Sequence, residues 1–397
     1  MKRLFSGAPL ILAALLAAPP ASAQDTASVA APAATPADSA ARREGVRVCA
    51  GGDVTLGTNL DTTWVHTAAA RLGPRVRALP SPDSLLAPLR PLLEDADVVL
   101  LNVEAAIGEG PPERRKCAPG STACFAFRSP TSAAGALRRV RSGGEVVGNV
   151  ANNHARDTGL GGWRTTQRHL RDAGVHVTGA DTLATPVATA AGDTVAFLGY
   201  SAWIGPDVND VASMRRHVRR AAERWRHVVV TMHAGAEGTG AQRTPDAVEV
   251  AFGERRGNSV AFARAALEAG ADVVFGHGPH VMRGAEWYGR GLAFYSLGNL
   301  LTYGPFSFGE PLNRGALACV VFDEDGVASA ELRSTVQSAP GWVRPDPTGR
   351  AAWLVESLSR ADFPAGAPRV AASGELGRPT AGEFGGAPGG SAPRRKP

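Results

Sequence analysis

Residues 273–280 have the sequence VVFGHGPH, a short apolar run that leads into two glycines, a proline and two histidines. The apolar, β-branched run is typical of a buried strand, and the glycines allow the chain to turn sharply after it. His277 and His280 lie three residues apart in this turn. Two imidazoles around a proline in a glycine-flanked turn have few structural reasons to be there, so the stretch predicts a metal-binding or catalytic strand end.

The same arrangement, an apolar run followed closely by polar side chains, occurs at several other places in the chain. Runs at 46–50, 98–101, 146–150 and 228–232 also have strand-like composition. The polar residues that follow these four runs are, in order, Asp53; Glu104; Asn152, Asn153 and His154; and His233 and Glu237.

Strand-like runs alternate with helix-length segments over most of the chain. Further apolar runs lie at 195–200, 292–295 and 317–322, and apolar residues have helical spacing at 163–173 and 260–269. This alternation predicts an α/β fold with layered architecture, in which the carboxyl ends of the strands line one crevice. Polar residues scattered over the whole sequence would therefore converge on one site.

The collected side chains offer carboxylate, amide and imidazole donors. That mixture suits Zn, Mn or Fe in hydrolase sites that hold one or two divalent transition metal ions. Such ions lower the pKa of a bound water and neutralise charge on the substrate oxygen. A carboxylate, Asp53 or Glu104, could bridge two ions, and a histidine outside the metal shell could protonate the leaving group.

Each group taken alone also has a simpler explanation. Asp53 could cap a helix, and Glu104 could be a solvated loop residue. Asn152 and Asn153 could make Asx turns, and His233 could be a hydrogen-bonded core histidine. Because five such groups each follow a strand, their combination favours a metal centre.

The N-terminal residues predict export. Lys2 and Arg3 precede an apolar run at 10–18 that is too short to span a bilayer, and residues 21–23 (ASA) supply a cleavage site. We expect a signal peptide at 1–23, with a retained anchor helix as the alternative, and no integral membrane span after cleavage. The mature protein would lie in the periplasm, in the cell envelope or outside the cell.

Composition divides the rest of the chain into one folded domain and two flanks. Residues 24–45 and 361–397 are rich in small residues and proline without periodicity, which predicts a disordered linker and a disordered tail. The folded domain would then span 46–360. The formal net charge of +5 over 397 residues, with scattered basic residues, makes no case for nucleic acid binding.

Four cysteines allow more than one pairing. Cys117 and Cys124 lie close together in a loop, where a disulfide would suit an oxidising compartment. Cys49 and Cys319 lie in strand-like runs and are expected to be small buried hydrophobic residues, although a bridge between them is the alternative.

Six ordered motifs carry a resemblance to a known family. They are GGDVTLG (51–57), NVEAAIG (102–108), NVANNHARDTG (149–159), HAGAE (233–237), GADVVFGHGPHV (270–281) and FYSLGNLLTYG (294–304). In this order they resemble the CapA capsule-synthesis (poly-γ-glutamate accessory) family over residues 46–303. The resemblance implies a calcineurin-like metallophosphoesterase fold, a four-layer αββα sandwich of two packed sheets flanked by helices.

The resemblance also implies roles for individual residues. His154 would be the catalytic histidine, and Glu104 would take the place of the bridging aspartate. The metal ligands would be Asp53, Glu104, Asn153, His233, His277 and His280, and the residues lining the site would include Asn152, Glu237 and Asn299. Arg128, in the FRSP turn, could pair with a substrate carboxylate.

Two positions depart from the pattern of the family. Thr55 stands where calcineurin-like enzymes usually have a histidine ligand, which puts occupancy by two ions in doubt. Gly278 stands where CapA-type sequences often have a second histidine. If that histidine binds substrate in the family, this protein would differ from it in substrate specificity.

Three functions are compatible with these residues. The first is a metal-dependent hydrolase or transferase that acts on an anionic envelope or capsule polymer such as poly-γ-glutamate. The second is a phosphoesterase that acts on a phosphorylated small molecule, because the same metals serve phosphoryl and acyl centres. The third is a non-catalytic factor that works with the capsule synthesis or export machinery.

Overall fold

The computed structural model describes residues 45–56, 58–59, 80–110, 113, 125–304 and 306–379. The predicted signal peptide, the predicted linker up to residue 44, and the Cys117 and Cys124 pair lie outside the described residues, as do residues 380–397. None of the helices in the described part is long and apolar enough to span a membrane.

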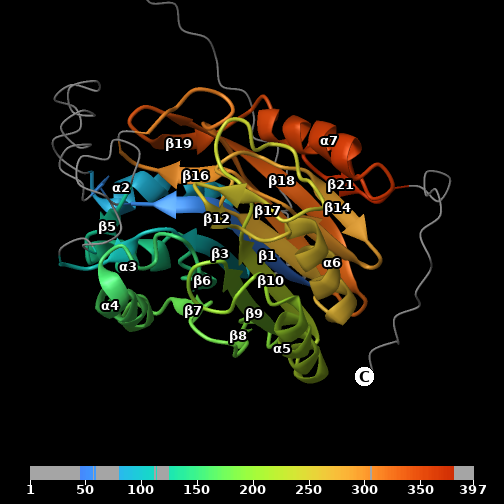
Figure 1. The fold of residues 1–397 in the computed structure, drawn as a ribbon, viewed down its shortest axis with the longest axis horizontal. Coiled ribbons are helices and arrows are strands. Elements are labelled where there is room, and N and C mark those ends of the chain that lie inside the picture. Colours follow the sequence, from blue (N-terminus) through green and yellow to red (C-terminus); the bar gives the residue numbers. More distant parts are fainter. Residues whose placement is uncertain are drawn as a thin grey trace, which may run out of the picture. The chain divides into compact units, whose positions relative to one another are not determined.

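The larger sheet has eight strands and is centred on β1 (Figure 1). β1 pairs in parallel with β3 and β16 and antiparallel with β17. The order is β19–β18–β17–β1–β3–β6–β7, with β16 pairing beside β1. The strands are β1 (Val46–Thr55), β3 (Val98–Val103), β6 (Glu145–Asn149), β7 (His176–Thr178), β16 (Asn299–Thr302), β17 (Arg314–Asp323), β18 (Gly326–Ser338) and β19 (Trp342–Pro345).

The second sheet has six strands in the order β14–β15–β13–β10–β9–β8. Its centre is parallel, because β10 pairs in that sense with both β9 and β13. The strands are β8 (Thr185–Ala188), β9 (Thr194–Ser201), β10 (His227–His233), β13 (Val273–His277), β14 (Ala285–Tyr288) and β15 (Gly291–Phe294).

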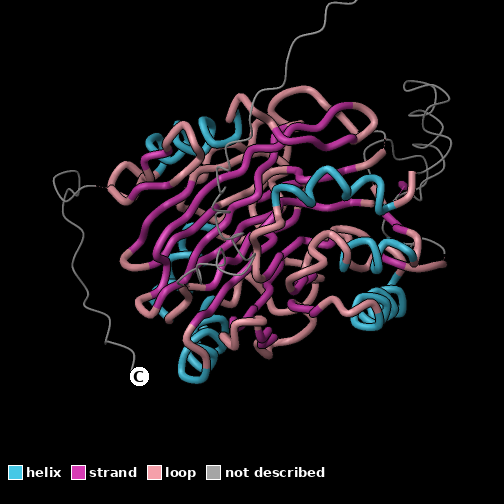
Figure 2. Tube along the Cα trace, turned by 180° about the vertical axis from the view of Figure 1, so that it is seen from behind, coloured by secondary structure: helices cyan, strands magenta, loops and turns pink. Residues whose placement is uncertain are grey.

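One hydrophobic core joins the two sheets, since it contains side chains from β1, β3, β17 and β18 as well as from β9, β10, β13 and β15. A second core covers the opposite face of the larger sheet with α2 (Pro82–Leu86), the 3₁₀ helix η2 (Ala87–Leu92), α3 (Ser132–Arg138) and α4 (Gly159–Asp172). A third covers the six-stranded sheet with α5 (Val211–Arg224) and α6 (Ser259–Ala269). Figure 2 shows the strands side by side in the middle, with the helices outside them.

Local sequence explains how these helices begin and end. The Asn258 side chain caps α6 by accepting from the backbone N–H of Ala261, and Gly270 ends the helix in a left-handed conformation. The Asp210 side chain caps α5 through the N–H of Ser213 in the same way.

The two sheets and the helices that cover them confirm the mixed α/β class and are consistent with a layered sandwich. The likeness to metallophosphoesterases stays a prediction.

The ordered chain continues beyond residue 360, so the predicted tail was placed too early. Helix α7 (Arg350–Asp362) packs on β14, β17 and β18, and it is followed by the hairpin of β20 (Arg369–Val370) and β21 (Leu376–Gly377). Leu376 is buried in the core between the sheets. Two buried apolar side chains, Phe363 and Leu376, and backbone pairing thus hold a segment that composition alone assigns to the tail.

Small strands complete the described fold. A three-stranded sheet is formed by β2 (Thr58–Asn59), β5 (Phe127–Ser129) and β4 (Ala106–Ile107), and a hairpin by β11 (Val250–Ala251) and β12 (Glu254–Arg255).

A disulfide links the middle of the larger sheet. Cys49 of β1 and Cys319 of β17 lie opposite each other in the antiparallel pair and are bonded. Both residues are fully buried, as expected, and the bridge between them, which the sequence left open, is present.

Candidate metal centre

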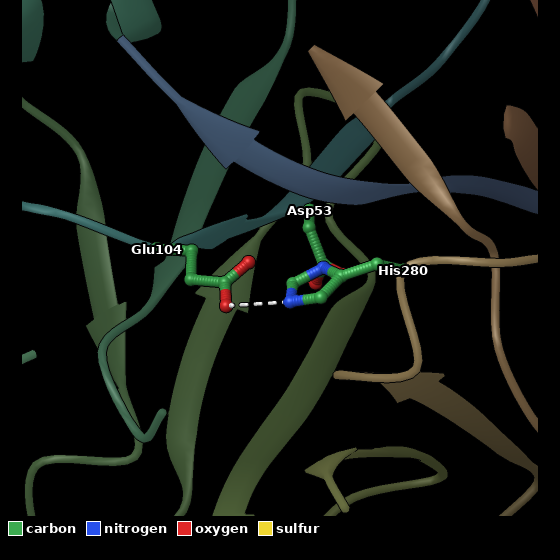
Figure 3. Close-up of side chains that lie close together, drawn as sticks. All are labelled: Asp53, Glu104 and His280. Atoms are coloured by element: carbon green, nitrogen blue, oxygen red, sulfur yellow. Dashed lines mark hydrogen bonds and ion pairs between the residues drawn. The ribbon is translucent and has the colours of Figure 1, made fainter. Parts of the chain in front are cut away.

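Asp53, Glu104 and His280 form a compact group in which one ligand atom of each lies within 4.8 Å of the others (Figure 3). Asp53 lies near the end of β1, Glu104 directly follows β3, and His280 lies in the turn after β13. His280 has a left-handed backbone, with φ of 59°, which turns its ring back towards the two carboxylates. Its Nδ1 is 2.9 Å from Asp53 Oδ2.

The Glu104 carboxylate lies between two imidazoles. Its Oε1 is 3.6 Å from His280 Nε2 and 3.7 Å from His233 Nε2. Glu104 and His233 are both buried, His233 being the last residue of β10. If a divalent ion binds here, Glu104 could hold it together with a neighbouring imidazole.

His233 and His277 supply further imidazole nitrogens in the same buried region. His277 Nδ1 is 3.8 Å from Asp53 Oδ1. His233 Nε2 and both ring nitrogens of His277 are buried without a hydrogen-bond partner among the described residues. Buried polar atoms are normally satisfied, so these nitrogens, together with the two carboxylates, fit a bound divalent ion.

Burial and charge shift the pKa values of these groups in different directions. Burial lowers the pKa of His277 to about 4, although the charge of Asp53 opposes this shift. Burial likewise holds the pKa of His233 well below its ordinary value. Burial would also lower the pKa of His280, but the charge of Glu104 and the hydrogen bond with Asp53 prevail and raise it to about 10. Burial alone would raise the pKa of Asp53, whereas the hydrogen bond and charge of His280 lower it.

Asn102 is the centre of the polar network and was not predicted from the sequence. Its Nδ2 donates to Asp53 Oδ1 at 2.8 Å and lies 3.1 Å from His233 Nδ1. Its Oδ1 accepts from Asn149 at 3.0 Å and from Asn152 at 3.3 Å. Asn102 stands inside β3, so the search for polar residues after strands passed over it, although it belongs to the NVE motif.

Asn152, Asn153 and His154 form the turn after β6. Asn152 Nδ2 donates to the carbonyl of Val103 at 2.9 Å, and its Oδ1 accepts from the His154 N–H at 3.1 Å. Asn152 therefore fixes the turn to β3. Asn153 is half-buried between them, and its role as a ligand stays a prediction.

His154 is oriented by a second residue that the sequence did not reveal. His154 Nδ1 lies 2.7 Å from Asp157 Oδ2, and both side chains are buried. The same Asp157 oxygen accepts from the Phe127 N–H at 2.6 Å, and the Phe127 ring lies 4.2 Å from the imidazole. Asp157 and Phe127 thus hold the ring with Nε2 as the nitrogen that can exchange a proton with a substrate.

Glu237 and Asn299 both contact His280. Glu237 Oε2 is 3.7 Å from His280 Nε2 and accepts from Arg256 at 2.6 Å. Asn299 Oδ1 is 3.1 Å from His280 Nδ1, and its Nδ2 donates to the carbonyl of Leu312 at 3.1 Å. Both predicted site-lining residues therefore lie beside the group in Figure 3.

Arg128 lies apart from His154. It donates to the carbonyl of Gly110, whereas Phe127, the residue before it in β5, faces His154. Because successive side chains of a strand point to opposite sides, Arg128 points away from His154.

The two positions that depart from the family pattern have structural explanations. Thr55 Oγ1 donates to the carbonyl of Glu104 at 3.1 Å, so the side chain ties β1 to the residue after β3. Gly278 has φ of 108°, and a Cβ there would lie 3.1 Å from the His233 ring. A side chain at Gly278 would therefore be strained and would press on His233.

Comparison with known proteins places the chain in a family. A family model described as "Bacterial capsule synthesis protein PGA_cap" matches residues 47–303, a span that contains all the residues in Figure 3. The capsule biosynthesis protein CapA of Bacillus anthracis is 28% identical over 190 residues, which is 42% of each chain. An uncharacterized protein of Sinorhizobium fredii is 37% identical over 93 residues, 23% of this chain and 18% of that one.

Among solved structures, GAP50, the anchor in the inner membrane complex of Plasmodium, aligns over 74% of this chain and 85% of its own. The TM-score is 0.38 at 9% sequence identity. The chain spans less than half the length of the two curated relatives. The family match covers most of the described fold, and the chain belongs to the bacterial capsule synthesis protein family.

Proposed function

We propose that this protein is an exported, metal-dependent hydrolase or transferase that acts on an anionic polymer of the cell envelope or capsule, such as poly-γ-glutamate. The observation that carries the proposal is the buried group of Asp53, Glu104 and His280, with the unpartnered nitrogens of His233 and His277 beside it. Burying so many ionisable side chains without a ligand is costly, which is why such groups concentrate at functional sites.

The metal would be held by the two carboxylates together with His233, His277 and His280. A bound divalent ion supplies Lewis acidity and a low pKa for water. The protein's own contribution is rigid placement, because Asn102 links Asp53 to His233 and Asn152 links this network to His154.

His154 would act as the general acid. Its Nδ1 is bound to Asp157, so proton transfer to the leaving group would proceed from Nε2. The burial of Asp157 and the contact with Phe127 restrict rotation of the ring. A leaving amine of a polyamide chain, or a leaving alkoxide of a phosphate ester, would receive this proton.

The choice of a polymer substrate is supported by the family and by the name of the Bacillus anthracis relative. The family and this relative also support a location in the envelope. An association with capsule synthesis or export machinery is part of the proposal. A phosphoesterase is the second candidate, because the ligand set serves phosphoryl centres equally well.

The test uses the purified, Mn²⁺-loaded protein with two substrates, poly-γ-glutamate and a chromogenic phosphate ester. Turnover of the polymer is measured as a decrease in chain length and a release of free amine. His154→Ala should lower kcat on the true substrate by about 10²–10⁴-fold, the usual contribution of a general acid, while metal content is unchanged. His176→Ala is the matched control, since this histidine pairs with Glu145 at the surface.

The outcomes separate the candidate functions. Turnover of the polymer that chelation abolishes supports the proposal, and turnover of the ester alone supports the phosphoesterase. Metal-loaded protein that turns over neither class would contradict both and favour the non-catalytic assembly factor. Full activity of His154→Ala would remove His154 from the mechanism.

A further inference from the structure

Helix α5 concentrates positive charge on the outside of the six-stranded sheet (Figure 1). Residues 211–226 contain six arginines and one glutamate, so this segment alone has the formal net charge of +5 that the whole chain has. The six are Arg215, Arg216, Arg219, Arg220, Arg224 and Arg226. We propose that the exposed face of α5 is a second binding surface for the anionic polymer, which holds the polymer while the metal centre acts on it. The inference rests on the proposed function, because it takes the polymer named there as the ligand.

Three arginines of this face have no acidic partner. Arg215 and Arg226 each form an ion pair with a glutamate on another segment. Arg219, Arg220 and Arg224 are exposed, and they form no ion pair within the described part of the chain. Their charges are therefore available to a ligand.

The spacing of the arginines produces a row of like charges. Arg216, Arg220 and Arg224 are four residues apart, so they follow one another along one side of the helix. Burial lowers the pKa of His217 beside them, and the charges of Arg216 and Arg220 lower it further. Glu223 lies in the same stretch, but among the described residues it forms no ion pair. Like charges at this spacing destabilise a helix, and a bound polyanion would supply the missing counter-charges.

The fold connects this face to the metal centre. Ser201, the last residue of β9, lies opposite His233 in the parallel pair with β10, so β9 ends at the edge where the metal centre lies. The loop that follows contains Trp203, whose ring lies edge-on to His233 at 5.4 Å. α5 then runs back along the sheet for about 20 Å, the length of its 14 residues, and β10 begins at His227 shortly after it ends. A polymer bound along α5 can thus extend to the metal centre.

The chemistry of the face favours a polyanion over a membrane. Each guanidinium presents a planar fork of donors that binds a carboxylate through two parallel hydrogen bonds. A helix that binds a membrane surface inserts apolar side chains between the lipids. The apolar residues Met214, Val218 and Ala221 of α5 are buried instead, and none of the large exposed apolar residues of the described fold lies on α5. The partner that fits is therefore a flexible chain with many free carboxylates.

Two variants that remove the same charge from different helices test the role of α5. The α5 variant combines Arg219→Gln, Arg220→Gln and Arg224→Gln. The matched control combines three substitutions of exposed arginines on α4, which covers the larger sheet: Arg164→Gln, Arg168→Gln and Arg171→Gln. Thermal unfolding checks that both variants are folded.

The first measurement is binding, which needs no turnover. Calorimetry at low and high salt compares a long poly-γ-glutamate chain with a γ-glutamate trimer on the full, Mn²⁺-loaded protein. At low salt the α5 variant should bind the long polymer about tenfold more weakly than the wild type, because three exposed ion pairs are lost. Its affinity for the trimer should change less, since a short chain cannot reach the metal centre and α5 together. The α4 control should bind as the wild type does.

Three results of this measurement would overturn the surface. Unchanged polymer binding by the α5 variant is one, and equal weakening in both variants is another, because it would be an effect of net charge alone. The third is weaker binding of the α5 variant to vesicles of phosphatidylglycerol and phosphatidylcholine with polymer binding unchanged, which would assign α5 to a membrane.

Kinetics separates this inference from the proposed function. KM for the long polymer should rise in the α5 variant while kcat is retained, since the metal centre is intact. Turnover with the same KM in wild type and α5 variant would contradict the surface and leave the hydrolase standing. Binding that depends on α5 without any turnover would support the surface and contradict the hydrolase, whereas a wild type that neither binds nor turns over the polymer would contradict both.

Discussion

Asn102 shows at the scale of one residue how the buried polar groups are held. Its amide reaches Asp53 and His233, and its carbonyl oxygen accepts from Asn149 and Asn152. Asn149 and Asn152 keep other acceptors, the carbonyls of Ala151 and Val103, when Asn102 is removed. Removing the Asn102 side chain would therefore mainly cost the hydrogen bonds to the Asp53 carboxylate and the His233 ring.

Asn102→Ala should lower the free energy of unfolding of the metal-free protein by about 1–3 kcal/mol, the cost of leaving a buried polar group unsatisfied. Urea unfolding in the presence of chelator measures this. Asn209→Ala is the control, because the exposed Asn209 side chain donates to its neighbour Asp207. Equal stability of Asn102→Ala and wild type would show that the network contributes nothing to the fold.

At the same scale, some site residues could be predicted and others could not. Asp53, Glu104 and His280 follow apolar runs, and the recurrence of this position in five groups pointed to them. Asn102 lies within a strand, and the role of Asp157 depends on a turn that brings it back to His154. In the sequence, neither Asn102 nor Asp157 can be distinguished from an ordinary polar residue.

The hairpin of β20 and β21 is the element that composition mispredicted. Its segment contains glycine, proline and alanine, yet the Leu332 N–H donates to the carbonyl of Gly374 at 2.8 Å and Leu376 is buried. The strands of the two sheets were predictable because each is a continuous apolar run. The hairpin was not, because two residues per strand provide no periodic pattern.

Leu376→Ala should destabilise the protein by about 2–5 kcal/mol, as expected for removing a buried leucine side chain from a core. Leu183→Ala is the control, since Leu183 is 64% exposed. Thermal or urea unfolding compares the two. A change for Leu376→Ala no larger than that for Leu183→Ala would mean that the hairpin is not part of the folded core.

At the scale of the whole molecule, the fold gathers residues from both sheets. Asp53 and Glu104 come from the eight-stranded sheet, while His233 and His277 come from the six-stranded sheet. Parallel strands end at one edge of a sheet, so convergence within each sheet could be foreseen. Contacts between distant segments could not, and the disulfide of Cys49 and Cys319 joins residues 270 positions apart.

The metal content of the purified protein tests the central claim most directly. Elemental analysis should find one or two equivalents of Mn, Zn or Fe per chain in the wild type, and a His277→Ala/His280→Ala variant should have lost them while remaining folded. Wild-type protein that stays metal-free after incubation with each of these ions would contradict the account, and equal metal content in the variant would place the ion elsewhere.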